Sequence, residues 1–130
     1  MAKFSNTSKQ KLETCHEDLQ LIINEAIKDY DFSVLCGYRS NEEQDKLYKK
    51  GVSKVKAGGS KHNLSPSLAV DIAPYPIDWN DKNRFYYLAG IINRIASENN
   101  IAIRWGGDWN GDGNFKNQTF HDLPHFEIKS

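Results

Sequence analysis

Apolar residues recur at helical spacing in two long segments, which predicts two amphipathic helices with one buried face each. The first helix is expected at residues 8–29, with Thr7 or Ser8 as its N-terminal cap. Its apolar stripe is Leu12, Cys15, Leu19, Ile22, Ile23, Ala26 and Ile27. The second helix is expected from a cap at Asn80 to about Glu98. Its apolar stripe is Phe85, Leu88, Ala89, Ile92, Ile95 and Ala96.

Four short apolar runs have the length and composition of β-strands. They lie at residues 32–36, 68–73, 101–105 and 125–128. A short helix is predicted after the first of them, from Asn41 to about Lys50, with Ser40 as its cap and Gly51 as its stop. Strands and helices do not alternate strictly, so the fold class is predicted to be α+β, a small and mainly antiparallel sheet backed by helices. A length of 130 residues predicts one domain, residues 1–130.

Composition narrows the class of protein. Apolar residues make up 38% and charged residues 26%, as in a soluble globular protein. No apolar run approaches the roughly 20 residues of a membrane span, and the N-terminus lacks the apolar core of a signal peptide. Synthesis in a cytoplasm without an export signal is therefore expected. Cys15 and Cys36 are too few for a disulfide framework, so two buried free thiols are predicted.

The net charge of zero argues against a nucleic-acid-binding protein, whose affinity depends on contacts with phosphates. The positive charge is nevertheless concentrated, because the segment from Lys46 to Lys61 holds six lysines and no acidic residue. Such a segment is either an ordinary solvated loop or a basic lip beside His62 that attracts an anionic polymer.

Asp71 is the first candidate functional residue. It lies among the apolar residues Ala69, Val70, Ile72 and Ala73, and a buried carboxylate without a partner is costly. His62 lies in the preceding loop, and a second His- and Asp-rich stretch spans residues 121–128. A catalytic zinc site takes three protein ligands of these types. From spacing alone, however, His62 reads equally well as an exposed loop histidine and Asp71 as a structural hydrogen-bond acceptor.

The local sequence motifs around these residues are more informative than their spacing. The stretches Ser60-Lys61-His62, Pro66-Ser67-Leu68-Ala69-Val70-Asp71-Ile72 and Asp122-Leu123-Pro124-His125-Phe126-Glu127 resemble the zinc peptidases of the D-Ala-D-Ala carboxypeptidase group. That group includes the vancomycin-resistance D,D-peptidases, and its fold is shared with hedgehog signalling domains. Gly37-Tyr38-Arg39-Ser40 with Gln44 is similar to the arginine element of the family.

Three further stretches resemble phage endolysins of the L-alanyl-D-glutamate peptidase type. They are Ala73-Pro74-Tyr75, Ile77-Asp78-Trp79-Asn80-Asp81 and Arg104-Trp105-Gly106-Gly107-Asp108-Trp109-Asn110. One departure stands out: His62 and Asp71 are nine residues apart, whereas much of the family has seven with a glycine between them. We interpret Pro66-Ser67 as part of a loop insertion that changes the path of the loop and not the ligands.

The resemblance implies a role for each matching residue. His62, Asp71 and His125 are expected to bind Zn²⁺, and Asp122 to transfer a proton from the attacking water to the leaving amine. Arg39 is expected to bind a substrate carbonyl or carboxylate and to stabilise the oxyanion. The simpler alternatives are a turn-capping acid for Asp122 and a surface salt bridge for Arg39.

The remaining residues near these motifs have weaker assignments. Ser60 and Gln44 are candidates for substrate binding. Glu127 is either a partner of a metal ligand or an ordinary strand residue, and the sequence does not separate the two. His121 is interpreted as a loop residue and His16 as a structural one.

A second ion site is predicted after the third strand. Asp108, Asn110, Asp112 and Asn114 match the alternating oxygen ligands in the first half of a calcium loop, although Thr119 stands where the pattern has a bidentate Glu. A plain turn explains the same composition. The related phage peptidases include calcium-regulated examples, so the resemblance implies Ca²⁺ as a regulatory ion that orders the loop carrying Asp122.

The function implied is that of a phage endolysin, a zinc endopeptidase that cuts the L-Ala–D-Glu bond of peptidoglycan stem peptides. The alternatives are a D-Ala-D-Ala carboxypeptidase and a hedgehog-like zinc-containing module that binds without catalysis. The expected partner is peptidoglycan, with no nucleic acid and no membrane, and the protein is expected to be a monomer. It is expected in the host cytoplasm and, after membrane permeabilisation, in the periplasm and cell wall.

Overall fold

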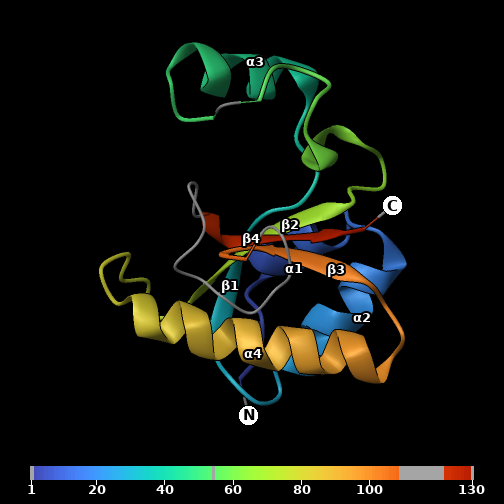
Figure 1. The fold of residues 1–130 in the computed structure, drawn as a ribbon, viewed down its shortest axis with the longest axis vertical. Helices are drawn as coiled ribbons and strands as arrows, with labels where there is room; N and C mark the ends of the chain where they lie inside the picture. The colour runs from blue at the N-terminus through green and yellow to red at the C-terminus, as the bar shows by residue number, and fades with distance from the viewer. Residues whose placement is uncertain (1, 54, 109–121, 130) are drawn as a thin grey trace.

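The computed structural model describes residues 2–53, 55–108 and 122–129. Within them, four strands form one sheet in the order β1-β2-β4-β3, and every neighbouring pair is antiparallel (Figure 1). The strands are β1 (Phe32–Cys36), β2 (Ala69–Pro74), β3 (Ile103–Gly106) and β4 (Asp122–Ile128). The helices are α1 (Asn6–Leu12), α2 (Glu17–Ala26), α3 (Asn41–Lys49) and α4 (Lys82–Glu98), with a 3₁₀ turn η1 (Lys61–Asn63). The predicted α+β class with an antiparallel sheet is confirmed.

The two faces of the sheet differ in chemistry because successive strand residues point to opposite sides. Val70 and Ile72 of β2 lie in the hydrophobic core with Phe126 of β4 and Trp105 of β3. The apolar faces of α2 and α4 complete this core, and Figure 1 shows α4 running along one side of the sheet. The alternate residue, Asp71, is therefore placed on the face away from the core.

The first predicted helix is two helices, α1 and α2, and this prediction of residues 8–29 is wrong at its centre. Residues 14–16 pair with Ser67 instead: the amide of His16 donates to the Ser67 carbonyl at 2.8 Å, and the amide of Ser67 donates to the Thr14 carbonyl at 2.9 Å. His16 then caps α2 through its Nδ1, which accepts from the amide of Asp18. The cap of α1 is Ser5, not Thr7 or Ser8.

The other helices follow the predicted pattern more closely. All six predicted apolar residues of α4 are buried, but the helix begins after Asp81, and Asn80 is not its cap. Ser40 caps α3 as predicted, because its hydroxyl accepts from the amide of Glu43. Gly51 follows α3 with a positive φ of 76°, which a glycine adopts without strain.

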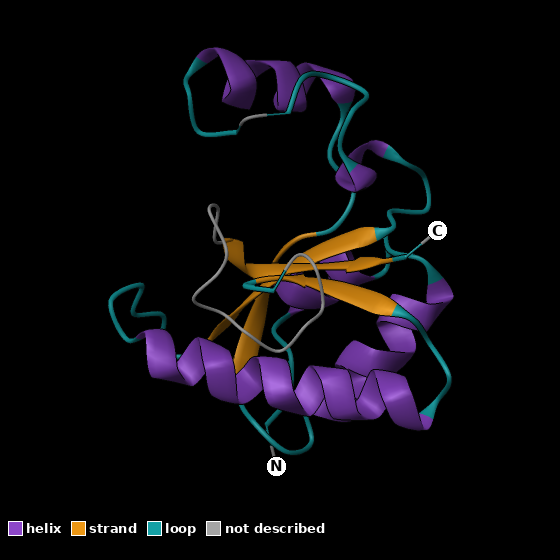
Figure 2. Ribbon diagram, viewed as in Figure 1, coloured by secondary structure: helices purple, strands orange, loops and turns teal. Residues whose placement is uncertain are grey.

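Helix α3 and the loops on either side of it stand away from the sheet (Figure 2). They carry Arg39 at one end and η1 with His62 at the other, so this arm lies over the polar face of the sheet. Both cysteines are free thiols, as predicted, although Cys36 is partly exposed. No helix in the described residues is long and apolar enough to cross a membrane.

Candidate metal centre

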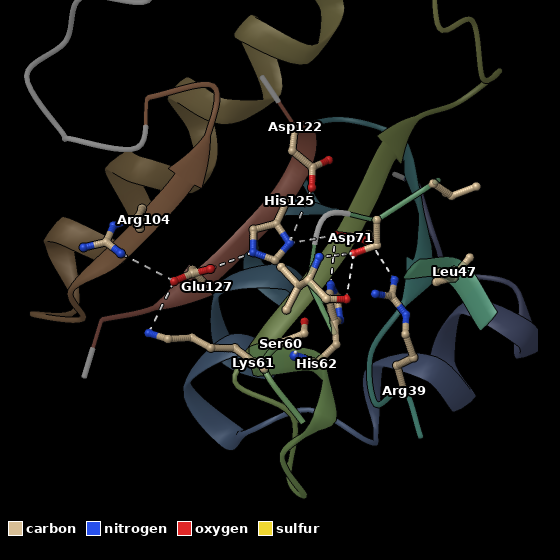
Figure 3. A pocket seen from close by; sticks show the side chains of 14 residues that line it. Arg39, Leu47, Ser60, Lys61, His62, Asp71, Arg104, Asp122, His125 and Glu127 are labelled. Carbon is tan, nitrogen blue, oxygen red and sulfur yellow. Dashed lines mark hydrogen bonds and ion pairs between the residues drawn. The ribbon is translucent and has the colours of Figure 1, made fainter. Parts of the chain in front are cut away.

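Three side chains from distant parts of the sequence converge on the polar face of the sheet (Figure 3). Asp71 of β2 is paired in register with His125 of β4, and the two share a face. His62 reaches the same point from η1. Its Nε2 lies 3.1 Å from Oδ1 of Asp71, and Nδ1 of His125 lies 3.1 Å from the same oxygen. The structure thus brings together the three residues predicted as zinc ligands.

A capped turn positions His62. The hydroxyl of Ser60 accepts from the amide of His62 at 3.2 Å, and the amide of Ser60 donates to the side chain of Asn63 at 3.1 Å. The turn is fixed to the start of the α3 arm because the amide of Arg39 donates to the carbonyl of His62 at 2.7 Å. His62 is consequently buried, so its reading as an exposed loop histidine is wrong.

The outer nitrogen of each imidazole bonds to an acceptor. Nδ1 of His62 lies 2.7 Å from the carbonyl oxygen of Gly37, and Nε2 of His125 lies 2.8 Å from Oε1 of Glu127. A carbonyl or carboxylate oxygen only accepts, so both outer nitrogens carry the proton. In the neutral imidazoles each inner nitrogen then carries a lone pair that points at the carboxylate of Asp71. The two nitrogens and the carboxylate oxygen, all electron-pair donors, repel one another unless a cation lies between them. Zinc binds such a set of nitrogen and oxygen ligands.

Without a metal, protons take the same positions. Burial alone would lower the pKa values of the imidazoles, but the hydrogen bonds and charge of Asp71 outweigh it, together with Cys36 at His62 and Glu127 at His125. They raise the pKa of His62 to about 10 and that of His125 to about 9. Burial opposes the charge of Asp71 as well, yet its hydrogen bonds with both histidines hold its pKa well below the usual range. The centre is therefore a strong cation site, occupied by two protons or by a metal.

Two further residues offer metal-ligand atoms at this centre. Among the described residues, the ligand atoms of Cys36, His62 and Asp71 lie within 4.8 Å of one another, and so do those of Asp71, Asp122 and His125. Asp71 belongs to both groups and is the residue around which the donors are arranged. Asp122 and Cys36 flank it from β4 and β1.

Asp122, the predicted proton-transfer residue, is the first residue of β4. Its Oδ2 lies 4.0 Å from Nδ1 of His125, and its side chain is partly exposed. Burial, together with the negative charge of Asp71, raises the pKa of this carboxyl group. Asp122 is therefore beside the three converging side chains and remains accessible.

Arg39 approaches Asp71 from the opposite side. Its Nη2 lies 3.6 Å from Oδ2 of Asp71, and its Nη1 donates to Oε1 of Gln44 at 2.8 Å. Gln44 is fully buried, so it is a poor candidate for the direct substrate contact predicted for it. Its amide nitrogen donates instead to Ser53 at 2.9 Å and to the carbonyl of Val55 at 2.7 Å. Gln44 thus joins Arg39 to the loop after α3.

These side chains line a pocket of about 460 Å³ between the sheet and the α3 arm. The apolar part of its wall comes from Leu47, Val52 and Val55. The polar part consists of Arg39, Ser53, Ser60, Lys61, His62, Asp71, Arg104, Asp122, His125 and Glu127. Ser60, predicted to contact substrate, lines this pocket as well as capping η1. A cavity with a few convergent polar groups has the form of a binding site.

A model of the phage L-alanyl-D-glutamate peptidase family matches residues 1–129 of the chain. The chain belongs to this family. It is 29% identical over 134 residues to the L-alanyl-D-glutamate peptidase of Escherichia phage T5, with 97% of each protein covered. It is also 30% identical over 122 residues to the peptidoglycan L-alanyl-D-glutamate endopeptidase CwlK of Bacillus subtilis, a match that covers 79% of this chain and 64% of CwlK.

Solved structures support the fold of this L-alanyl-D-glutamate peptidase family member. The Serratia marcescens L-Ala D-Glu endopeptidase ChiX matches with a TM-score of 0.79 and 28% identity, over 98% of this chain and 90% of ChiX. The vancomycin resistance D,D-dipeptidase VanXYg, solved with a D-Ala-D-Ala phosphinate analogue, matches with a TM-score of 0.54 and 23% identity, over 86% of this chain and 47% of VanXYg. The predicted D,D-peptidase-like fold is confirmed.

Sequence reasoning missed several contributors to the centre of this family member. The carbonyl of Gly37 has no signal in the sequence, because any residue supplies a carbonyl. Glu127, left undecided, is a partner of His125, and its alternation with that residue along β4 was the available signal. Arg104 was given no role, whereas Lys61 was predicted only as part of a basic lip beside His62; both line the pocket. His121 and three predicted calcium ligands, Asn110, Asp112 and Asn114, lie outside the described residues.

Proposed function

We propose that this family member is a zinc peptidase that hydrolyses the L-Ala–D-Glu bond of peptidoglycan stem peptides and serves as a phage endolysin. The observation that carries the proposal is the convergence of three lone-pair donors beside Asp122 in one pocket. Family membership supports the choice of bond, since the phage T5 and Bacillus subtilis relatives are named for L-alanyl-D-glutamate cleavage.

His62, Asp71 and His125 are the residues that would hold the zinc ion, through nitrogen and oxygen donors. Zinc bound there supplies Lewis acidity, which polarises a substrate carbonyl and makes water acidic enough to lose a proton near neutral pH. The residues around the site do the rest of the chemistry. The hydrogen bonds that the imidazoles donate to Gly37 and Glu127 hold both rings in the tautomer that ligation requires.

Asp122 transfers the proton in this proposal. Its raised pKa makes it a stronger base than an ordinary carboxylate, and its position beside His125, a proposed ligand, supports this role. It accepts a proton from the attacking water and returns that proton to the amine of the leaving D-Glu. Arg39, which is permanently charged, stabilises the negative charge that develops on the carbonyl oxygen.

Mass spectrometry of purified peptidoglycan fragments tests this proposal. Incubation with the protein should produce new N-terminal D-Glu ends, and these should vanish with a zinc chelator and with the Asp122→Asn variant. Release of free D-Ala would show a D-Ala-D-Ala carboxypeptidase instead. A zinc-loaded protein that cuts no bond would refute the enzyme assignment and favour a binding module of the hedgehog type.

The remaining aspects of the proposal concern the cell. We propose that the enzyme reaches peptidoglycan from the host cytoplasm once the membrane has been permeabilised, and that it acts as a monomer. Regulation by calcium stays a prediction, because of its four residues only Asp108 lies in the described part of the chain. Calcium titration of the rate of cleavage tests it.

A further inference from the structure

The end of the pocket that lies toward β3 carries a cationic group that the proposed mechanism does not use. It is formed by Arg104 of β3, Lys61 of η1 and Glu127 of β4, named here the β3-side cluster. Figure 3 shows the β3-side cluster on one side of His125 and Asp71, with Arg39 on the other. The centre is therefore flanked by positive charge at two separate places in the same pocket.

The charges of the β3-side cluster do not cancel. Two cations surround one carboxylate, which leaves one net positive charge. Both carboxylate oxygens of Glu127 have partners other than Arg104: Oε1 bonds to His125 at 2.8 Å, and Oε2 lies 3.3 Å from Nζ of Lys61. Lys61 also donates to the carbonyl of Ile128. Lys61 and Glu127 are thus committed to each other and to their neighbours.

Arg104 is held less tightly. Its Nη1 lies 3.8 Å from Oε2 of Glu127, beyond hydrogen-bond distance, and its side chain is 41% exposed. Its Nε is buried and has no hydrogen-bond partner among the residues described. A guanidinium offers five donors in a planar fork that matches a carboxylate. Arg104 therefore has spare donors at the wall of the pocket.

We infer that Arg104 binds the free carboxylate of the D-Glu residue in the substrate. The inference rests on the proposed function, in which D-Glu follows the scissile bond. Glutamate has two carboxyl groups, its amine is consumed in the bond to L-Ala, and a linear chain continues through only one carboxyl. The other remains an anion close to the bond that is cut. A permanent cation next to the metal centre is the complementary group.

This assignment gives the substrate a direction in the pocket. The free carboxylate belongs to D-Glu, so the leaving side of the bond lies toward β3 and Arg104. The L-Ala side then lies toward Arg39 and the α3 arm. Arg104 acts as a specificity-determining residue: it favours a substrate with a charged D-Glu over one in which that carboxyl is an amide.

A pair of synthetic peptides tests the inference. Both contain the L-Ala–D-Glu bond with the chain continued through one carboxyl of D-Glu; the second carboxyl is free in one peptide and a carboxamide in the other. We expect the wild type to have a kcat/KM about ten- to a hundredfold higher for the acid, as a charge-assisted hydrogen bond provides. Arg104→Gln should lower kcat/KM for the acid to near that for the amide and change the amide by less than about twofold. Arg104→Lys should give an intermediate preference.

The matched control is Arg94→Gln, which removes an exposed arginine of α4 that pairs with Asp29 in the turn after α2. This variant should keep the full preference. Zinc content and thermal unfolding show whether each variant is folded. Should Arg104→Gln not fold, the test is made on the wild type by raising the salt concentration. The ratio of kcat/KM for the acid to that for the amide should shrink as ionic strength rises, because the pair of Arg104 with the carboxylate is partly exposed.

Several results would overturn the inference. Equal loss on both peptides in Arg104→Gln, or no preference in the wild type at low salt, would refute the subsite while the peptidase assignment stood. Cleavage of neither peptide by the zinc-loaded wild type would refute the proposed function, and the subsite with it.

Discussion

Two hydrogen bonds at the back of the histidines decide which nitrogens face the metal centre. The acceptor for His62 is a backbone carbonyl, which no side-chain substitution removes. The acceptor for His125 is the carboxylate of Glu127, whose pKa is lowered because its bond to His125 and the nearby Lys61 outweigh its burial. A single side-chain substitution can therefore remove the acceptor that orients His125, but not the one that orients His62.

Glu127→Ala should weaken zinc binding about 10- to 100-fold, because His125 loses the acceptor that fixes its tautomer and ring. Glu127→Gln retains an acceptor oxygen and should lose less. Competition with a chromophoric chelator measures both affinities. Glu98→Ala, an exposed change on α4, serves as the control. Unchanged zinc affinity in Glu127→Ala would show that Glu127 does not position His125 for the metal.

Asp122 and Asp71 should separate catalysis from metal binding. Asp122→Asn should lower kcat by about 10²- to 10⁴-fold with zinc content retained, because the base is lost and the proposed ligands stay. Asp71→Asn should lose bound zinc, and its activity with it, because the carboxylate that both histidines face is gone. Metal analysis beside the rate of peptide cleavage distinguishes them. Loss of zinc in Asp122→Asn would instead make Asp122 a ligand.

At the scale of elements, the buried amide of Gln44 connects a residue just before α3 with the loop after it. Gln44 connects Arg39 with Ser53 and Val55, and all three of these residues line the pocket. Positions of Arg39 and of the loop are therefore coupled, although neither belongs to the sheet.

Gln44→Leu should destabilise the protein by about 1–3 kcal/mol, because Arg39 and the Val55 carbonyl lose a buried partner. It should also raise the rate of proteolysis between residues 51 and 59, where the loop loses its anchor. Chemical denaturation and limited proteolysis measure the two effects. Tyr87→Leu, an exposed change on α4, is the comparison. A Gln44→Leu variant as resistant to protease as the wild type would contradict the anchoring role.

Local patterns predicted the elements because their causes are local. Ser40 caps α3 and the apolar stripe of α4 is buried, as periodicity and capping chemistry require. The break between α1 and α2 was not predictable, since it follows from the pairing of residues 14–16 with Ser67, about fifty residues away in sequence. The identity of the three converging side chains came from motif resemblance, whereas their tautomers and the role of Gln44 needed the three-dimensional contacts.

For the whole molecule, the centre predicts how stability depends on pH in the metal-free protein. The pKa values of His62 and His125 are raised to about 10 and about 9, above the unfolded value near 6.5. Their contribution is complete below pH 6.5 and is lost as the pH rises through 9 and 10. The lowered pKa of Asp71 contributes above about pH 4 and is lost in acid.

We therefore expect the Tm of the metal-free protein to be highest between about pH 4 and 6.5 and to fall from pH 6.5 to 10. Zinc displaces the protons, so the zinc-loaded protein should show a smaller fall over the alkaline range. Thermal unfolding followed by circular dichroism, with and without chelator, measures the difference. A metal-free Tm that rises between pH 7 and 9 would contradict the assigned directions.

The sheet assigns its two faces to different tasks, and this alternation has a consequence for variation along β2 and β4. Val70, Ile72 and Phe126 face the core, so changes there reduce the amount of folded protein. Asp71, His125 and Glu127 point the other way, so changes there act directly on zinc binding and turnover. Mutations at alternate residues of these strands should therefore have different main effects: those on the core face lower the abundance of the protein, and those on the polar face lower its activity.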